Sequence, residues 1–190
     1  MATPIQNAAR QSQHSFLIEQ NTGSLRQAIA LIENIDDETY ITSPPSLAPH
    51  RVGGHLRHIL EFYECFLDGI ETSHIDYDAR KRDEAIETSR ETALARTRSV
   101  IRRLETAVQL RGDWIVWVKV EDAPASRLDD AFMTSSIGRE IQALASHTVH
   151  HFALIAMTLQ ALGYRLDRNF GMAPSTLRYQ AAKKAAVEAA

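Results

Sequence analysis

Residues 52–70 read VGGHLRHILEFYECFLDGI, and this stretch decides the fold. Its apolar residues recur every three or four positions, which places them on one face of a helix, while charged residues occupy the opposite face. The apolar stripe consists of Val52, Leu56, Ile59, Tyr63, Phe66, Leu67 and Ile70. The charged face carries Arg57, Glu61, Glu64 and Asp68. The pattern predicts an amphipathic helix that packs against other helices.

Three further stretches have the same periodicity. They predict helices over residues 6–35, over residues 84–110, and from Ser135 or Ser136 to Gly163. Gly23 interrupts the first pattern, and Gly112 is a plausible stop for the second. Between residues 36 and 51, three prolines within six positions exclude a helix and predict a connection.

One segment has a different pattern. Residues 113–121, DWIVWVKVE, alternate in β-branched and aromatic types, which predicts a short strand. A weaker partner strand is expected over residues 127–133, after a turn at residues 122–125. The expected fold is therefore all-α: a four-helix bundle with a long crossover and a small β excursion before the last bundle helix. Residues 1–165 form the bundle, and residues 166–190 form a tail that packs on it or is partly disordered.

The composition limits the classes of function. The chain has 190 residues, 44% of them hydrophobic and 24% charged, as expected for one globular domain. A net charge of −3 argues against nucleic-acid or anionic-membrane partners, and the apolar stretch at residues 152–164 is too short to span a bilayer. A single cysteine, Cys65, excludes an intramolecular disulfide. With no export signal in the first residues, we expect a cytoplasmic protein.

The histidines are the most informative residues of the sequence. Five of the eight fall in two short windows, at positions 55 and 58 and at positions 147, 150 and 151. His147 and His151 are four residues apart, so both can reach one metal ion from the same helix face, whereas His150 points nearer to solvent. Such a pair alone is more often a surface feature without a ligand. A second helix that offers another imidazole favours a metal site instead, because bundles build metal sites between facing helices.

The periodicity does not decide between His55 and His58 as the third ligand. His55 lies closer to the apolar stripe and is slightly favoured, while His58 lies toward its polar edge. Three neutral imidazoles without a thiolate suit a divalent ion such as Zn²⁺, Ni²⁺ or Fe²⁺. They leave coordination positions for water or substrate, which is typical of a catalytic site rather than a structural one.

The two histidine stretches, VGGHLRHILEFYECFL and SHTVHHFALI, resemble the DinB and YfiT superfamily of small bacterial metal-binding bundles. In that superfamily one ligand lies in the second helix and an HxxxH pair lies in the last. The resemblance implies His58, His147 and His151 as metal ligands, with His55 in reserve. It also implies a bundle with a long crossover, frequent dimerisation, and in some members thiol-dependent transferase activity. Where many members carry polar residues after the last ligand, this chain has Phe152, Ala153 and Leu154.

The function expected from these observations is that of a metal-dependent enzyme, either a hydrolase or a thiol-dependent S-transferase. It would act on a small-molecule substrate, with a low-molecular-weight thiol as a candidate partner, and it would be a homodimer. The alternative is a non-catalytic metal-binding or scaffold bundle. No phosphate-binding loop or serine-nucleophile motif supports another chemistry.

Other polar residues receive simpler interpretations. Glu61, one turn beyond His58, is a candidate for holding an imidazole tautomer, although it lies on the polar face. Cys65 is expected to be a small buried side chain rather than a reactive thiol. Two groups of charged residues are expected to have no special role. The first forms an ordinary loop, for which orienting a substrate is the less favoured alternative, and the second forms a solvated helix face. They are Asp76, Asp78, Arg80 and Arg82 in the loop, and Arg96, Arg98, Arg102 and Arg103 on the helix.

Overall fold

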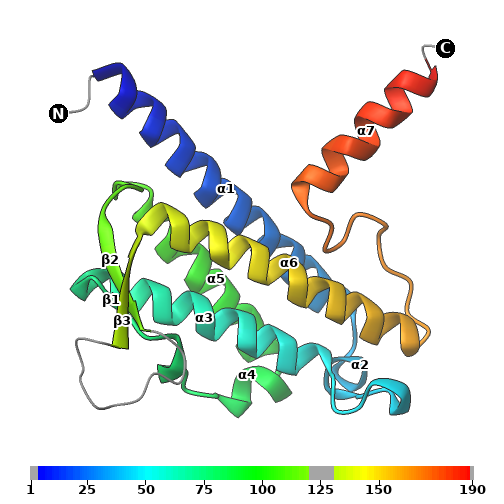
Figure 1. The fold of residues 1–190 in the computed structure, drawn as a ribbon. Coiled ribbons are helices and arrows are strands. Elements are labelled where there is room, and N and C mark those ends of the chain that lie inside the picture. The colour runs from blue at the N-terminus through cyan, green and yellow to red at the C-terminus, as the bar shows by residue number, and fades with distance from the viewer. Residues whose placement is uncertain (1–3, 120–130, 189–190) are drawn as a thin grey trace.

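The computed structural model describes residues 4–119 and 131–188. Long helices dominate this part of the chain, and a small three-stranded sheet lies at one end of them (Figure 1). The long helices are α1 (Pro4–Asn34), α3 (Val52–Thr72), α5 (Arg90–Ala107), α6 (Ile137–Ala161) and α7 (Pro174–Glu188). The expectation of a mostly helical chain with a small β element is confirmed.

Four of these helices enclose the core. α3 contacts both α5 and α6, and α1 contacts the same two helices, so the apolar faces of all four point inward. The predicted stripe of α3 is buried: Leu56, Ile59, Tyr63 and Phe66 are at most 1% exposed. Ile141, Leu144, Phe152 and Ile155 of α6 meet them in the same core. Burial of these side chains is the main force that holds α3 against α6.

The helix ends follow local signals. Ser136 caps α6, because its hydroxyl accepts a hydrogen bond from the backbone N–H of Arg139, and Gly163 follows that helix with a φ of 81°. Gly23 does not interrupt α1, since the packed apolar face outweighs the poor helix propensity of one glycine.

The prediction of a single helix over residues 84–110 is wrong. The chain forms α4 (Glu84–Thr88) and α5, with Ser89 extended between them. The Ser89 hydroxyl accepts a hydrogen bond from the backbone N–H of Thr92, so this serine starts a new helix instead of continuing the first. Short elements occupy the other connections: α2 (Asp37–Ile41), η1 (Pro45–Leu47) and η2 (Tyr77–Ala79).

The β element is larger than expected. β2 (Ile115–Lys119) pairs antiparallel with β3 (Phe132–Ser136), and β1 (His74–Ile75) pairs parallel with β2 on its other side. The predicted partner strand over residues 127–133 therefore falls partly on β3, while residues 120–130, including the predicted turn, lie outside the described residues. β3 leads directly into α6, so the sheet anchors the start of the helix that carries two of the candidate ligands.

The segment after α6 first returns to the helical body and then leaves it. The Phe170 ring stacks on that of Phe152 at 4.8 Å between centroids, and α7 projects away from the other helices (Figure 1). Among the described residues, none of the helices combines the length and the apolar character that a membrane span requires.

Gly53 lies where α3 and α4 approach most closely. A Cβ atom at this position would lie 2.0 Å from the Glu87 carbonyl oxygen, whereas one at Gly23 would meet no atom within 4 Å. We expect Gly53→Ala to lower the free energy of unfolding by about 1–3 kcal/mol. Gly23→Ala should raise it by about 0.5–1 kcal/mol through higher helix propensity. Urea unfolding followed by circular dichroism measures both, and equal effects of the two substitutions would contradict this packing.

Candidate metal centre

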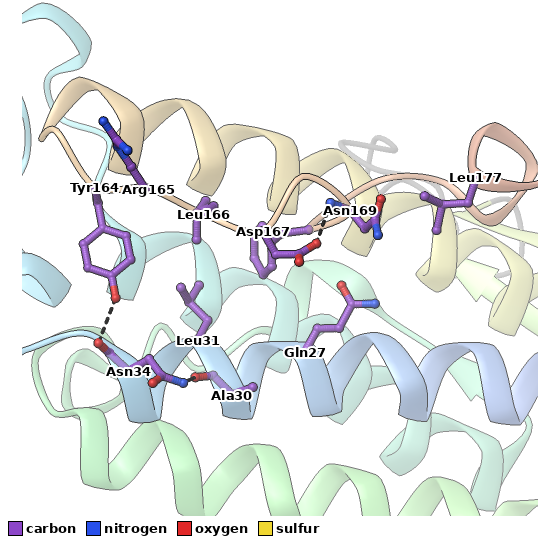
Figure 2. Close-up of a pocket in the computed structure, with 11 residues that line it drawn as sticks. Gln27, Ala30, Leu31, Asn34, Tyr164, Arg165, Leu166, Asp167, Asn169 and Leu177 are labelled. Carbon is purple, nitrogen blue, oxygen red and sulfur yellow. Dashed lines mark hydrogen bonds between the residues drawn. The ribbon is translucent and has the colours of Figure 1, made fainter. Parts of the chain in front are cut away.

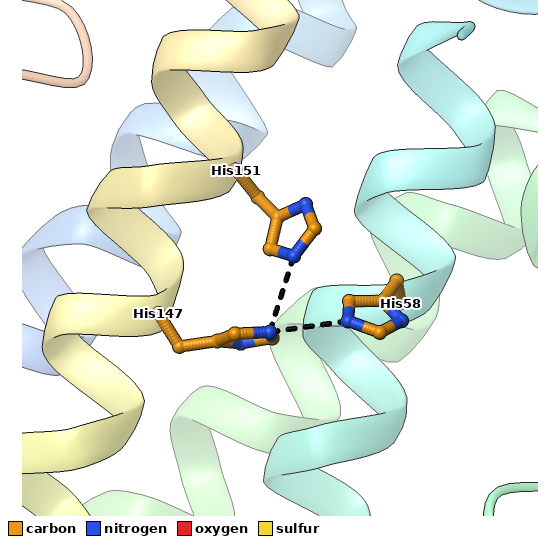
Figure 3. A group of neighbouring side chains, drawn as sticks. All are labelled: His58, His147 and His151. Carbon is orange, nitrogen blue, oxygen red and sulfur yellow. Dashed lines mark hydrogen bonds between the residues drawn. The ribbon is translucent and has the colours of Figure 1, made fainter.

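Three imidazoles from α3 and α6 meet at the interface between these helices (Figure 3). The Nε2 atom of His147 lies 3.1 Å from Nε2 of His58 and 3.1 Å from Nε2 of His151. His147 and His151 come from successive turns of α6, and His58 faces them from the N-terminal half of α3. The structure thus brings together the three residues that the resemblance implied as ligands.

The spacing of the three nitrogens suits a common metal ion. Nitrogen ligands at about 2.0–2.1 Å from a tetrahedral Zn²⁺ are separated from one another by roughly 3.3 Å. The two separations of 3.1 Å are close to this value, and all three ligand atoms lie within 4.8 Å of one another. Only small side-chain adjustments are needed for all three Nε2 atoms to bind one cation.

His55 occupies a different position from that expected of a ligand. Its Nδ1 atom lies 3.1 Å from Nδ1 of His151, the nitrogen on the far side of that ring from the cluster. His55 is therefore placed to hold the ring of His151 rather than to join the three Nε2 atoms. His150 is exposed, as its azimuth on the helix predicted.

The surroundings keep the clustered imidazoles neutral. Burial lowers the pKa of His58 and of His147 from 6.5 to about 4. Charge repulsion from His147 and Arg80 adds to this effect at His58, and repulsion from His150 and Arg80 adds to it at His147. Burial also lowers the pKa of His55 to about 4 and that of His151 to about 3. A neutral imidazole has a free lone pair for a cation, so all three candidate ligands are in their binding form at neutral pH.

One loop side chain reaches the cluster. The guanidinium of Arg80 lies over the Phe62 ring at 4.6 Å, and its Nη1 atom lies 3.2 Å from Nδ1 of His58. A guanidinium only donates, so this contact is a hydrogen bond only in the metal-free tautomer of His58 that has its hydrogen on Nε2, because Nδ1 carries the hydrogen when Nε2 binds a cation. Asp76 and Asp78 instead form ion pairs with Lys119 and do not face the histidines.

Several sequence interpretations are settled by these contacts. The carboxylate of Glu61 accepts a hydrogen bond from the backbone N–H of Asp83, and Nδ1 of His58 lies beside Arg80 instead, so the prediction that Glu61 holds this imidazole is wrong. Cys65 is half-buried, and burial raises the pKa of its thiol to about 11, which agrees with an unreactive side chain. The arginine-rich face of α5 is paired, as expected, through Arg96 with Glu64, Arg98 with Glu33, and Arg103 with Asp68.

A buried polar network next to the histidines was missed in the sequence. The hydroxyl of Tyr63 donates to Oδ1 of Asn21 at 2.6 Å and lies 3.0 Å from the hydroxyl of Thr148. Asn21 in turn donates to the carbonyl oxygen of Ile141. The network joins α1, α3 and α6 in the core, and it fixes α3 and α6 in register one position from His147. A tyrosine in an apolar stripe carries no sequence signal of such a partner.

A separate cavity lies between α1 and the segment after α6 (Figure 2). Its volume is about 530 Å³, and Leu31, Tyr164 and Phe170 are among its lining residues. The Tyr164 hydroxyl closes one end by donating to the carbonyl oxygen of Asn34. None of the three clustered histidines lines this cavity.

No protein-family model matches the chain. The chain is similar to a curated protein of Rhizopus delemar, FK506-binding protein 5, with 27% identity over 164 residues. This match covers 85% of the present chain and 37% of the relative, so the chain spans little more than a third of that protein's length.

The lowered histidine pKa values make the metal-free protein sensitive to acid. In the unfolded chain these imidazoles titrate near 6.5, whereas in the folded chain they titrate at about 3 to 4. Between these values the unfolded state binds more protons, so the free energy of unfolding should fall as the pH falls from about 6.5 to about 4. Urea unfolding at a series of pH values measures this slope. The slope should be shallower in the double variant His58→Gln/His151→Gln, and equal slopes would contradict the assignment.

Proposed function

We propose that this chain is a metal-dependent enzyme in which His58, His147 and His151 bind one divalent cation. The observation that carries the proposal is the meeting of three neutral Nε2 atoms, two of them 3.1 Å from the third. A set of three histidines leaves coordination positions for water or substrate. Zn²⁺, Ni²⁺ and Fe²⁺ are the candidate cations, because each accepts imidazole nitrogen.

The arrangement of the helices supports a finer description of the fold. α1, α3, α5 and α6 form a closed ring of helix contacts, with the sheet inserted before α6. This agrees with a four-helix bundle of the DinB and YfiT type, with a long crossover and the cation held between its second and last helices. The ligand positions implied by that resemblance are the positions that meet in space.

The proposed reactions are hydrolysis or the transfer of a low-molecular-weight thiol. A bound divalent cation polarises an electrophile or lowers the pKa of a bound water or thiol toward neutrality. The chain contributes the neutral ligands and a wall formed by Phe62, whose ring lies 4.2 Å from that of His147 and limits access of water from that side. The orientation of His151 is held by His55.

Two observations favour a second candidate, a non-catalytic metal-binding or scaffold bundle. Phe152, directly after the last ligand, is packed in the core, and Ala153 and Leu154 add no polar group. In addition, Nδ1 of His147 is buried without a hydrogen-bond partner in residues 4–119 and 131–188, whereas metal-binding histidines usually have one, and this favours the scaffold form of the alternative. Turnover of ester or thiol-acceptor substrates by the metal-loaded protein, lost in His147→Ala, would exclude this candidate.

The metal content of the purified protein tests the proposal directly. Protein prepared without a nickel column should contain about one divalent ion per chain, as expected for one three-histidine site. Metal analysis by mass spectrometry should show a loss of at least about tenfold in His58→Ala and His147→Ala, because two imidazoles bind far more weakly than three. His150→Ala, which removes an exposed neighbour outside the cluster, is the matched control and should retain the metal. Negligible metal in the wild-type protein, also after incubation with Zn²⁺, Ni²⁺ or Fe²⁺, would refute the site.

A further inference from the structure

A cavity of about 320 Å³ borders the metal centre at the N-terminal end of α3. His58 and His151 form part of its wall, so a molecule in this cavity lies next to two of the proposed ligands. The other lining residues used below are His55, Arg51, Arg57 and Glu87. The volume is within the range of small-molecule sites.

The charged side chains in this wall leave an excess of positive charge. Nε of Arg51 donates to Oε1 of Glu87 at 2.6 Å, and Nη1 of Arg57 lies 3.1 Å from Oε2 of the same carboxylate. Glu87 is the one acidic residue among the described lining residues, so two guanidinium groups share a single carboxylate. The first turn of α3, which has no side-chain cap, adds the positive end of its dipole. These charges favour an anionic ligand.

Two of the residues that form this wall also carry a side-chain nitrogen without a partner. Nε of Arg57 and Nε2 of His55 are buried, and neither has a hydrogen-bond partner within residues 4–119 and 131–188. His55 is only 8% exposed, so water does not readily satisfy its ring nitrogen. Buried donors of this kind are rare in proteins unless a ligand satisfies them.

Metal binding determines which hydrogen His55 carries. When Nε2 of His151 binds a cation, the hydrogen of that ring lies on Nδ1 and is donated to Nδ1 of His55, 3.1 Å away. Nδ1 of His55 is then an acceptor, and its hydrogen lies on Nε2. The unpartnered Nε2 of His55 is therefore a donor, as is Nε of Arg57.

We propose that this cavity binds an oxyanion group of the small-molecule substrate and thereby places the rest of the substrate at the metal centre. A wall with two guanidinium groups and one carboxylate, formed by residues that also carry unpartnered nitrogens, matches a carboxylate or phosphate, whose oxygens only accept. Glu87 positions both guanidinium groups. The inference rests on the proposed function, because the hydrogen on His55 follows from coordination by His151.

Paired thiols test the inference on the full-length protein loaded with Co²⁺. Mercaptoacetate and 3-mercaptopropionate carry a carboxylate, while 2-mercaptoethanol does not, and the thiolate-to-cobalt absorption band reports the binding of each. The carboxylate thiols should bind about tenfold more tightly or better, as expected for charge-assisted hydrogen bonds. This preference should fall to about twofold or less in Arg57→Gln. Arg80→Gln removes a guanidinium that lies beside His58 but outside the cavity wall, and it should keep the preference.

The outcomes separate the two hypotheses. Equal affinity of the wild-type protein for all three thiols, or a preference lost in Arg80→Gln rather than in Arg57→Gln, would overturn the oxyanion site and leave the metal centre intact. Failure of the protein to bind Co²⁺ would instead refute the metal centre on which this inference rests. Unchanged Co²⁺ binding by Arg57→Gln shows that the variant folds. Competition by acetate and by inorganic phosphate then identifies which oxyanion the cavity prefers.

Discussion

The register of α3 against α6 is the constraint on which the candidate site depends. Apolar packing holds the two helices together, but it tolerates small shifts along their axes. The buried contacts of Tyr63 with Asn21 and Thr148 do not tolerate such shifts. A shift of one turn would leave these polar atoms unpaired in the core. His147 directly precedes Thr148, and His58 lies five residues before Tyr63. The polar network in the core therefore sets the distance between imidazoles at the rim.

Burial gives the cluster its chemical character. The imidazoles are far enough inside the protein to remain neutral, yet the cavity beside them keeps one side accessible. A fully exposed cluster would lose its metal affinity by protonation at mildly acidic pH, and a fully buried one would admit no substrate. The position of the ligands at the edge of the core, rather than at its centre, reconciles these two requirements.

The sequence predicted the helices that carry the ligands because periodicity reports which face is buried. It ranked His55 above His58 for the same reason, and His55 is indeed the more buried of the two. The resemblance to a known superfamily instead implied His58, and it is the Nε2 atom of His58 that lies beside Nε2 of His147. The break at Ser89 and the two-residue strand β1 depend on single hydrogen bonds and tertiary contacts, which periodicity does not detect. Glu87 and Arg57 are thirty positions apart, and nothing in the sequence indicates that they meet.

The contact between His55 and His151 has a thermodynamic consequence. In the proposed metal centre this contact would connect the cation to the cavity wall through one shared hydrogen, so occupancy of the centre and occupancy of the cavity would not be independent. Linkage is reciprocal: if the cation strengthens the binding of an anion by some factor, the anion must slow the loss of the cation or speed its capture by the same overall factor. If both proposed sites are occupied in this way, the chain would retain its metal best while substrate is plentiful.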